Sequence, residues 1–235
     1  MNALADDALL GLWERGAGSG PVERALLLLG AALPEQSLEH CAAMPIGARD
    51  AEILKLRRAT FGGRLSGRAN CPRCREEHEF DLDIGELLAS VPPQAESEIA
   101  LDNGLRFRLP DSRDLAAIAH HADAEAAARH LLQRCCVDAP AELEWSHSLH
   151  EALDARLAGV AGTADIQLRL DCIACGETWT GRLDADSYVW EEITEHARRL
   201  LDDVHGLAAH YGWSEREILS MSGARRDAYL RRCFA

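Results

Sequence analysis

Aromatic residues are scarce in this sequence. It contains four Phe, three Tyr and five Trp among 235 residues, although hydrophobic residues as a group make up 47%. The core must therefore be built mainly from Leu, Ala, Ile and Val, and Leu and Ala are strong helix formers. The charged fraction of 27% is that of an ordinary globular chain. We expect a folded α+β protein that is mainly helical.

The sequence also lacks an excess of positive charge and any long apolar run. Its formal net charge of −14 opposes binding to a phosphate backbone. The most apolar stretch, residues 25–33, is much shorter than the roughly 20 residues that cross a bilayer. Asp6 and Asp7 stand where a secretory signal has basic residues. We therefore expect a cytoplasmic protein with no nucleic-acid or membrane partner.

Common catalytic motifs are missing as well. The sequence has no HExxH, no GxSxG and no phosphate-binding P-loop. The glycine-rich stretch 16–20 leads into Pro21 without the lysine that a P-loop requires. These absences indicate a protein that is not an enzyme and has no small-molecule substrate.

Cysteine, in contrast, is present in a distinctive pattern. Two motifs of the CxxC type occur, Cys71-Pro-Arg-Cys74 and Cys172-Ile-Ala-Cys175. In a cytoplasmic protein such pairs are usually metal ligands or redox centres, because structural disulfides are rare there. Each pair interrupts a stretch of alternating apolar residues, 65–84 and 166–185, which predicts a β-hairpin with the cysteines at its tip.

The two hairpins form an internal repeat. Positions 101 residues apart share identities, and the pairs are Arg68 and Arg169, Cys71 and Cys172, Cys74 and Cys175, Glu76 and Glu177, Leu82 and Leu183, and Asp83 and Asp184. Zn²⁺ in structural sites prefers a closed tetrahedron of thiolates. We therefore predict a split zinc ribbon in which one structural Zn²⁺ joins both hairpins into one small sheet, with the ligands Cys71, Cys74, Cys172 and Cys175.

Two alternatives to this zinc site remain open. The pairs can be redox centres of a thiol oxidoreductase, although neither follows a strand and opens a helix as a thioredoxin-like motif does. His78 can replace a thiolate at the first pair, but its equivalent in the repeat is Trp179. We expect His78 on the hairpin surface. A closed four-thiolate site has no open position for water or substrate, so the ion would stabilise the fold.

Helices and one further hairpin account for the rest of the chain. The predicted helices are 2–14, 21–33, 35–43, 49–60, three after residue 111 with caps at Ser112, Asp123 and Ser148, then 188–211, a short helix capped by Ser214, and one from Ser222 to Phe234. The turn Asp102-Asn103-Gly104 predicts a hairpin over 99–109, after a break at Pro92-Pro93. The resulting segments are 1–63 (helical), 64–96 (first zinc-ribbon hairpin), 97–162 (inserted hairpin and helices), 163–187 (second zinc-ribbon hairpin) and 188–235 (C-terminal helices).

Other polar and thiol residues have ordinary explanations. We expect Cys41, Cys135, Cys136 and Cys233 to be small buried side chains, and His120, His121 and His130 to lie on solvated helix faces. Glu192 with His196, and Asp202 with His205, have the spacing of ion pairs on one helix. The last two helices resemble a helix-turn-helix, which leaves a zinc-ribbon DNA-binding regulator as the alternative function, with the basic residues Arg225, Arg226, Arg231 and Arg232.

Several short motifs occur together in a recognisable order. They are Pro45-Ile-Gly-Ala-Arg-Asp50, Leu54-Lys-Leu-Arg57, Cys71-Pro-Arg-Cys74, Leu109-Pro-Asp-Ser-Arg-Asp-Leu115, Tyr211-Gly-Trp-Ser-Glu215, Glu217-Ile-Leu219 and Arg225-Arg-Asp-Ala-Tyr-Leu230. In these motifs the chain resembles a family of baseplate-associated accessory proteins of contractile phage-tail-like particles. The resemblance implies a non-enzymatic structural or assembly role, other baseplate, spike or tail-tube proteins as partners, and incorporation into such a particle. Ile173-Ala174 departs from the proline-containing loop expected in the second CxxC pair.

Overall fold

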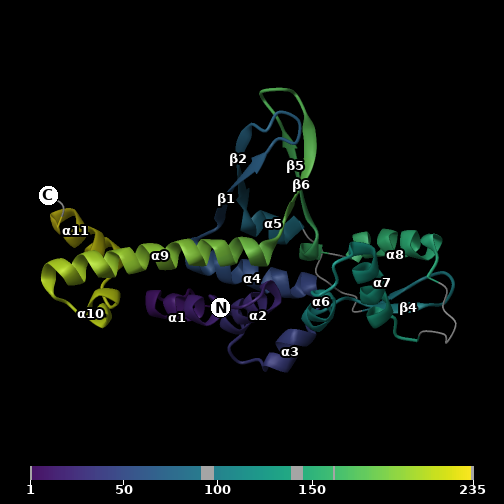
Figure 1. Cartoon of the computed structure of the whole chain (residues 1–235), viewed down its shortest axis with the longest axis horizontal. Coiled ribbons are helices and arrows are strands. Elements are labelled where there is room, and N and C mark those ends of the chain that lie inside the picture. The colour runs from purple at the N-terminus through teal and green to yellow at the C-terminus, as the bar shows by residue number, and fades with distance from the viewer. Residues whose placement is uncertain (1, 91–97, 139–144, 161, 234–235) are drawn as a thin grey trace.

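The computed structural model describes residues 2–90, 98–138, 145–160 and 162–233. It is an α+β structure in which helices predominate, as predicted (Figure 1). The helices are α1 (Asp6–Gly16), α2 (Pro21–Ala32), α3 (Leu38–Ala43), α4 (Ile46–Phe61), α5 (Ile84–Ser90), α6 (Ser112–Ile118), α7 (Ala124–Cys135), α8 (His147–Val160), the 3₁₀ turn η1 (Gly162–Ala164), α9 (Ala185–Tyr211), α10 (Glu215–Leu219) and α11 (Gly223–Cys233). The strands are β1 (Arg64–Asn70), β2 (Glu77–Asp83), β3 (Glu98–Ala100), β4 (Arg106–Arg108), β5 (Ile166–Asp171) and β6 (Thr178–Leu183).

Helix α9 is the long axis of the molecule, and α1, α2 and α4 pack against it (Figure 1). Their buried side chains form one core, whose members are Leu9, Leu10, Leu12, Ala25, Leu28, Ile53, Val189, Trp190, Ile193, Ala197 and Leu200. The Trp190 ring explains the glycine at the end of α1, because a Cβ on Gly16 would lie 2.1 Å from it. Leu201 of α9 lies outside this core and is 37% exposed.

Two antiparallel hairpins rise from this helical layer on the side away from α1 and α2 (Figure 1). Strand β1 pairs with β2 and β5 with β6, in two separate two-stranded sheets. The expectation of one joint sheet was therefore wrong. Leu65 and Ile84 share a core with Ile166 and Leu183, so apolar side chains at their bases, rather than backbone hydrogen bonds, join the hairpins.

A glycine on the inner face of each hairpin makes room for a large side chain on the paired strand. Gly67 lies opposite Phe80 in the first hairpin, and in the second a Cβ on Gly181 would lie 3.3 Å from Cδ1 of Leu170 on the paired strand. A Cβ on Gly67 would lie 2.4 Å from the Phe80 ring. The close pairing of β1 with β2 therefore requires a residue without a side chain at position 67.

The inserted segment between the hairpins has a core of its own. Its buried members are Ile99, Leu101, Phe107, Leu109, Cys135, Leu149 and Leu153. The hairpin predicted around Asp102-Asn103-Gly104 is present as β3 and β4. Helix α5 was not predicted, and the break at Pro92-Pro93 lies outside the described residues, as does Phe234.

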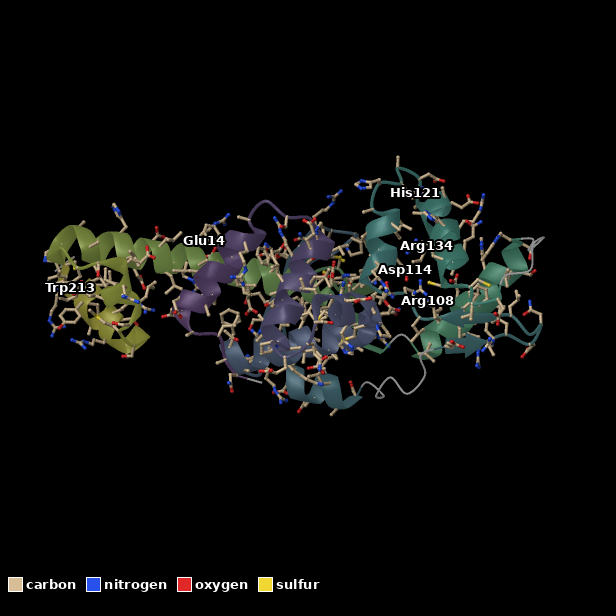
Figure 2. All side chains as sticks on the ribbon, turned by 90° about the horizontal axis from the view of Figure 1, so that it is seen from below. Glu14, Arg108, Asp114, His121, Arg134 and Trp213 are labelled. Carbon is tan, nitrogen blue, oxygen red and sulfur yellow. The ribbon has the colours of Figure 1, made fainter. Side chains whose placement is uncertain are left out.

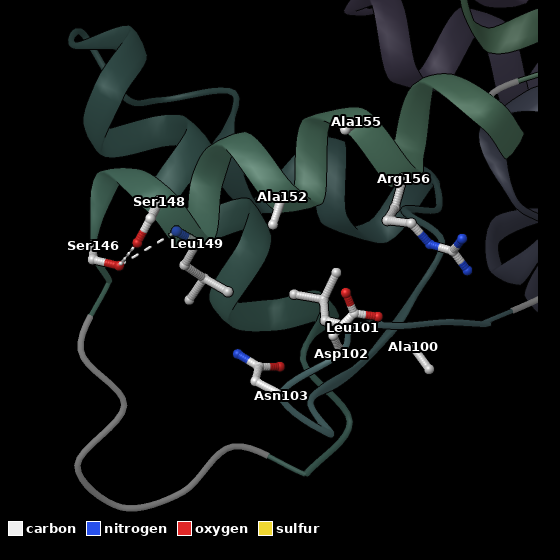
Figure 3. A pocket seen from close by; sticks show the side chains of 10 residues that line it. All are labelled: Ala100, Leu101, Asp102, Asn103, Ser146, Ser148, Leu149, Ala152, Ala155 and Arg156. Carbon is white, nitrogen blue, oxygen red and sulfur yellow. Dashed lines mark hydrogen bonds between the residues drawn. The ribbon is translucent and has the colours of Figure 1, made fainter.

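Two of the helix caps predicted in this segment were wrong. Asp111, not Ser112, caps α6, because its carboxylate accepts hydrogen bonds from the backbone N–H groups of Arg113 and Asp114. Ser148 lies within the first turn of α8, where Ser146 Oγ accepts from the N–H of Leu149 at 3.3 Å (Figure 3). In both cases the side-chain oxygen of a nearby residue accepts the capping hydrogen bond instead. Asp123 and Ser214 cap α7 and α10 as predicted.

A buried arginine joins the starts of α4, α6 and α9. The Arg49 side chain is 2% exposed and donates to Asp50 and Asp186, both at 2.8 Å, and to Ser112 Oγ at 3.4 Å. Burial raises the pKa of Asp50 to about 6. Burial, together with the neighbouring carboxyl of Asp184, raises the pKa of Asp186 to about 7. Two buried carboxyl groups thus share one guanidinium at this junction.

None of the described helices combines the length and apolarity required to span a membrane.

The raised pKa of Asp186 predicts how stability depends on pH. In the unfolded chain this carboxyl ionises near pH 4, whereas in the folded protein it keeps its proton up to about pH 7. Its contribution to stability is therefore present below about pH 4 and is lost as the pH rises toward 7. Asp186→Asn removes the titration and keeps an oxygen for Arg49. We expect the free energy of unfolding of this variant, relative to the native sequence, to increase between pH 5 and pH 7.5, as measured by urea unfolding.

The control is Asp202→Asn, because Asp202 is an exposed aspartate of the same helix. Its unfolding free energy is expected to run parallel to that of the native chain. Parallel curves for Asp186→Asn as well would contradict the burial effect.

Candidate metal centre

The two CxxC turns have the same backbone geometry. In the first, the N–H of Cys71 donates to Glu76 O at 2.9 Å and the N–H of Arg75 to Cys71 O at 3.0 Å. In the second, the N–H of Cys172 donates to Glu177 O at 2.7 Å and the N–H of Gly176 to Cys172 O at 2.9 Å. The sequence repeat is therefore also a structural repeat.

The turns differ in the residue that follows the second cysteine. Gly176 has φ of 72°, in the left-handed region that glycine enters without steric cost. Arg75 occupies the equivalent position with φ of 68°, and it is the only residue other than glycine with positive φ in the described chain. The first turn therefore carries backbone strain that the second does not.

The tips of the hairpins bring all four predicted ligands together. The sulfur atoms of Cys71, Cys74, Cys172 and Cys175, called the thiol cluster below, lie within 4.8 Å of one another. Across the hairpins, the Cys71 and Cys175 sulfurs are 3.7 Å apart and those of Cys74 and Cys172 are 3.5 Å apart. A tetrahedral ion with metal–sulfur bonds of about 2.3 Å requires sulfur–sulfur edges of about 3.8 Å. The cluster can therefore hold one metal ion with little movement.

Contact among the thiols separates their pKa values. Burial tends to raise the pKa of Cys71, but hydrogen bonds from the backbone N–H groups of Cys74 and Arg73 and from neighbouring thiols outweigh it and lower the pKa to about 7. At Cys175 the N–H of Glu177 lowers the pKa, while burial and the neighbouring thiols raise it more, to about 12. The first thiolate thus forms readily and the last does not. A divalent cation supplies the positive charge that lets all four ionise.

His78 is also a member of this site. The prediction that it lies on the hairpin surface was wrong. Its imidazole is half-buried, and Nε2 lies 3.1 Å from the sulfur of Cys172 on the other hairpin. His78 and Phe80 are two positions apart on one strand, so their side chains lie on the same face of the hairpin. This alternation could have indicated that His78 faces inward. A residue at the inner face beside a CxxC turn points toward the partner hairpin.

The remaining cysteines and histidines do not form a second metal site within the described residues. Cys41 and Cys135 are buried as predicted, whereas Cys136 and Cys233 are partly exposed. His121 and His130 are exposed and contact each other, with ring nitrogens 2.9 Å apart. Within the described residues, these two histidines belong to no group of three or more side chains that could bind a metal ion.

Glu192 and His196 on α9 have other partners than each other. Glu192 binds Arg57 of α4 at 2.6 Å, and His196 lies 3.6 Å from Asp6 of α1. The predicted ion pair between Glu192 and His196 was therefore wrong. Both side chains face neighbouring helices, which offer closer groups of opposite charge.

The C-terminal helices were the candidate DNA-binding element. Arg226 is buried in α11 and binds Asp6 of α1 at 2.7 Å and Asp203 of α9 at 3.5 Å. This guanidinium is therefore part of the packing of three helices and is not displayed to a ligand. Trp213 lies with these helices at one end of the molecule, stacked on Tyr211 at 4.4 Å (Figure 2).

The inserted segment, at the other end of the molecule, contains a buried network of ion pairs. Asp114 is fully buried and accepts from Arg108 at 2.7 Å and from Arg134 at 2.9 Å (Figure 2). Nearby, a groove of about 450 Å³ lies between α8 and the β3–β4 turn, with Asp102, Ser146 and Arg156 among its lining residues (Figure 3). It is open to solvent on the face of α8 that carries Ala152 and Ala155, and its polar groups do not converge on one point (Figure 3).

Comparisons of the chain with protein-family models, with curated proteins and with solved structures found no match.

Metal analysis tests the thiol cluster directly. We expect the purified chain to hold one divalent ion, and Cys172→Ser to lose it, because removing one of four thiolates opens the tetrahedron. The melting temperature should fall with the metal, since binding free energy is folding free energy at such a site. Cys41→Ser, which alters a buried cysteine outside the cluster, is the control. Its metal content should match that of the native chain, and equal content in Cys172→Ser would contradict the site.

Arg75→Gly tests the backbone strain at the first turn. A side chain in the left-handed region costs about 1–2 kcal/mol, and the greater freedom of glycine in the unfolded chain offsets part of the gain. We expect Arg75→Gly to stabilise the metal-loaded protein by about 0.5–1 kcal/mol in chemical unfolding. Gly176→Arg is the matched reverse change and should destabilise it. If both substitutions lower stability, the strain assignment is wrong.

Proposed function

We propose that this chain is a non-enzymatic structural or assembly protein organised around one structural zinc ion, and that it works in the baseplate of a phage-tail-like contractile particle. The observation that carries the scaffold role is the thiol cluster, which brings together cysteines 98 positions apart in the chain. An ion bound there by Cys71, Cys74, Cys172 and Cys175 would tie the N-terminal helices, the inserted segment and α9 to one point.

The ligand set favours zinc over other ions. Four sulfur donors in a tetrahedron suit zinc or iron, whereas magnesium and calcium require oxygen ligands. Zinc has no redox chemistry, and four thiolates leave it no open position for water or substrate. These properties support a structural ion and a protein without a catalytic centre there. Bound iron, which colours the protein, would overturn the choice of zinc.

The hairpin tips provide a surface for a partner protein. Figure 1 shows both tips projecting from the helical layer, far from the core that holds the helices together. Ile173 at the second tip is 94% exposed, the most exposed of the large hydrophobic residues described. Ala174, next in the chain, and Pro72, at the tip of the first hairpin, are exposed as well. An exposed apolar side chain at the end of a rigid projection suits insertion into an apolar socket on another protein.

The baseplate setting is supported by the sequence motifs that resemble the accessory family. Several of these motifs supply buried polar junctions of the fold. Arg49 and Asp50 lie near the start of α4, Asp111 and Asp114 lie at the start of α6, and Arg226 packs α11 against α1 and α9. Residues that are shared for this reason would preserve the architecture rather than a catalytic site. This fits an accessory protein that acts through its shape.

Co-purification tests the proposal. A tagged full chain, expressed with the proteins encoded by neighbouring genes, should bring down baseplate, spike or tail-tube components identified by mass spectrometry. Ile173→Asp should reduce their recovery about tenfold, which corresponds to a loss of about 1.4 kcal/mol, without changing the metal content.

The matched control is Leu38→Asp. Leu38 is 74% exposed on α3, remote from the tips, and its substitution should leave recovery unchanged. Recovery of no particle component would refute the baseplate proposal. Equal recovery with Ile173→Asp would refute the tip as the contact surface.

A further inference from the structure

His78 connects one hairpin to a cysteine of the other. It lies on β2, and its Nε2 is 3.1 Å from the sulfur of Cys172, which follows β5. Cys172 is 3% exposed, so water has little access to this sulfur. The contact therefore crosses between the two halves of the thiol cluster at a buried position.

The repeat makes this contact unsymmetrical. His78 and Trp179 occupy equivalent positions in the two hairpins, and their rings meet at a centroid distance of 5.7 Å. The ring pair lies beneath the thiol cluster on the inner faces of the hairpins. Only the first hairpin places an imidazole there, so the two halves of the cluster differ in their polar surroundings.

A divalent ion with four thiolates carries a net negative charge, and hydrogen bonds to the sulfurs disperse it. Backbone N–H groups serve this role at Cys71, Cys74 and Cys175. They belong to Cys74 and Arg73 for Cys71, to Glu76 for Cys74, and to Glu177 for Cys175. At Cys172 a side-chain group, the imidazole of His78, lies within hydrogen-bonding distance of the sulfur.

We propose that His78 is a positioning residue of the metal centre, which donates its Nε2–H to the metal-bound thiolate of Cys172 and retains that cysteine in the coordination shell. This inference rests on the proposed zinc centre. The imidazole must be the donor in this hydrogen bond, because a metal-bound thiolate has lone pairs and no proton. The imidazole must then be the tautomer with hydrogen on Nε2.

Direct coordination by His78 is the competing arrangement. Four sulfurs already satisfy a tetrahedral ion, so a nitrogen ligand would have to displace one of them. The sulfur positions, within 4.8 Å of one another, favour the hydrogen-bonding role. A donor at Cys172 lowers the charge on that sulfur, and therefore its reactivity toward alkylating agents and its rate of leaving the ion.

The test compares three substitutions in the full chain. His78→Phe keeps a ring against Trp179 and removes the donor, His78→Gln restores an N–H near the same place, and Trp179→Phe alters the ring pair without touching the donor. Zinc release to a chromogenic chelator is followed at one pH, with peptide mapping of alkylated cysteines. Cobalt-loaded protein reports the ligand set through its visible absorption.

We expect His78→Phe to release zinc about tenfold faster, as is usual when a partner of a metal ligand is lost, with Cys172 alkylated earlier than in the native chain. His78→Gln should recover slow release, and Trp179→Phe should resemble the native chain. The cobalt spectrum should be that of four thiolates in every variant.

Three results would overturn the proposal. These are unchanged release in His78→Phe, a cobalt spectrum that changes with loss of the imidazole, and fast release in both His78→Gln and Trp179→Phe, which would indicate packing alone. The native chain is assayed for zinc first. If it holds none, the metal centre itself fails, and that result is distinct from a failure of His78.

Discussion

Four thiols in mutual contact cannot all ionise unless a cation lies among them, and the proposed metal centre rests on this constraint. Burial and hydrogen bonds at the cluster separate the thiol pKa values, with that of Cys71 lowered to about 7 and that of Cys175 raised to about 12. A cation bound among the sulfurs would stabilise all four thiolates at a shared centre. The chain between the hairpins then has to leave the first hairpin and return to the second at nearly the same place. The inserted segment meets this requirement by folding around its own core.

A buried arginine connects the first hairpin to the helical layer. Arg57 of α4 binds Glu192 of α9 and donates to the backbone oxygens of Gly62 and Arg64, both at 2.7 Å. Tyr188 of α9 donates to the oxygen of Ser66 on β1 at 2.6 Å. These oxygens lie along the edge of the first hairpin, so α4 and α9 cover a strand edge that would otherwise be free. The first hairpin is thereby held against the helices, with its tip directed outward (Figure 1).

These features agree with the proposed scaffold role. The charged groups of Arg49, Arg57, Asp114 and Arg226 each bind an oppositely charged partner inside the protein. Function is therefore assigned to shape and to the projecting tips. In the same way, His78 is proposed to act through Cys172 and not on a substrate.

Much of this architecture was predictable because its causes are local. Apolar periodicity located α2, α4 and α9, and glycine and serine chemistry located the end of α9 and the start of α10. The repeated CxxC pattern identified all four members of the thiol cluster, since few structures other than a shared metal site account for two such pairs at equivalent positions. Contacts between elements that are far apart in the chain were decided only by the tertiary structure. Whether Arg49 and Arg226 are buried depends on which helices meet there, and the separation of the hairpins into two sheets depends on how their inner faces pack. The contact of His78 with Cys172 joins residues 94 positions apart, and only the arrangement of the two hairpins brings them within hydrogen-bonding distance.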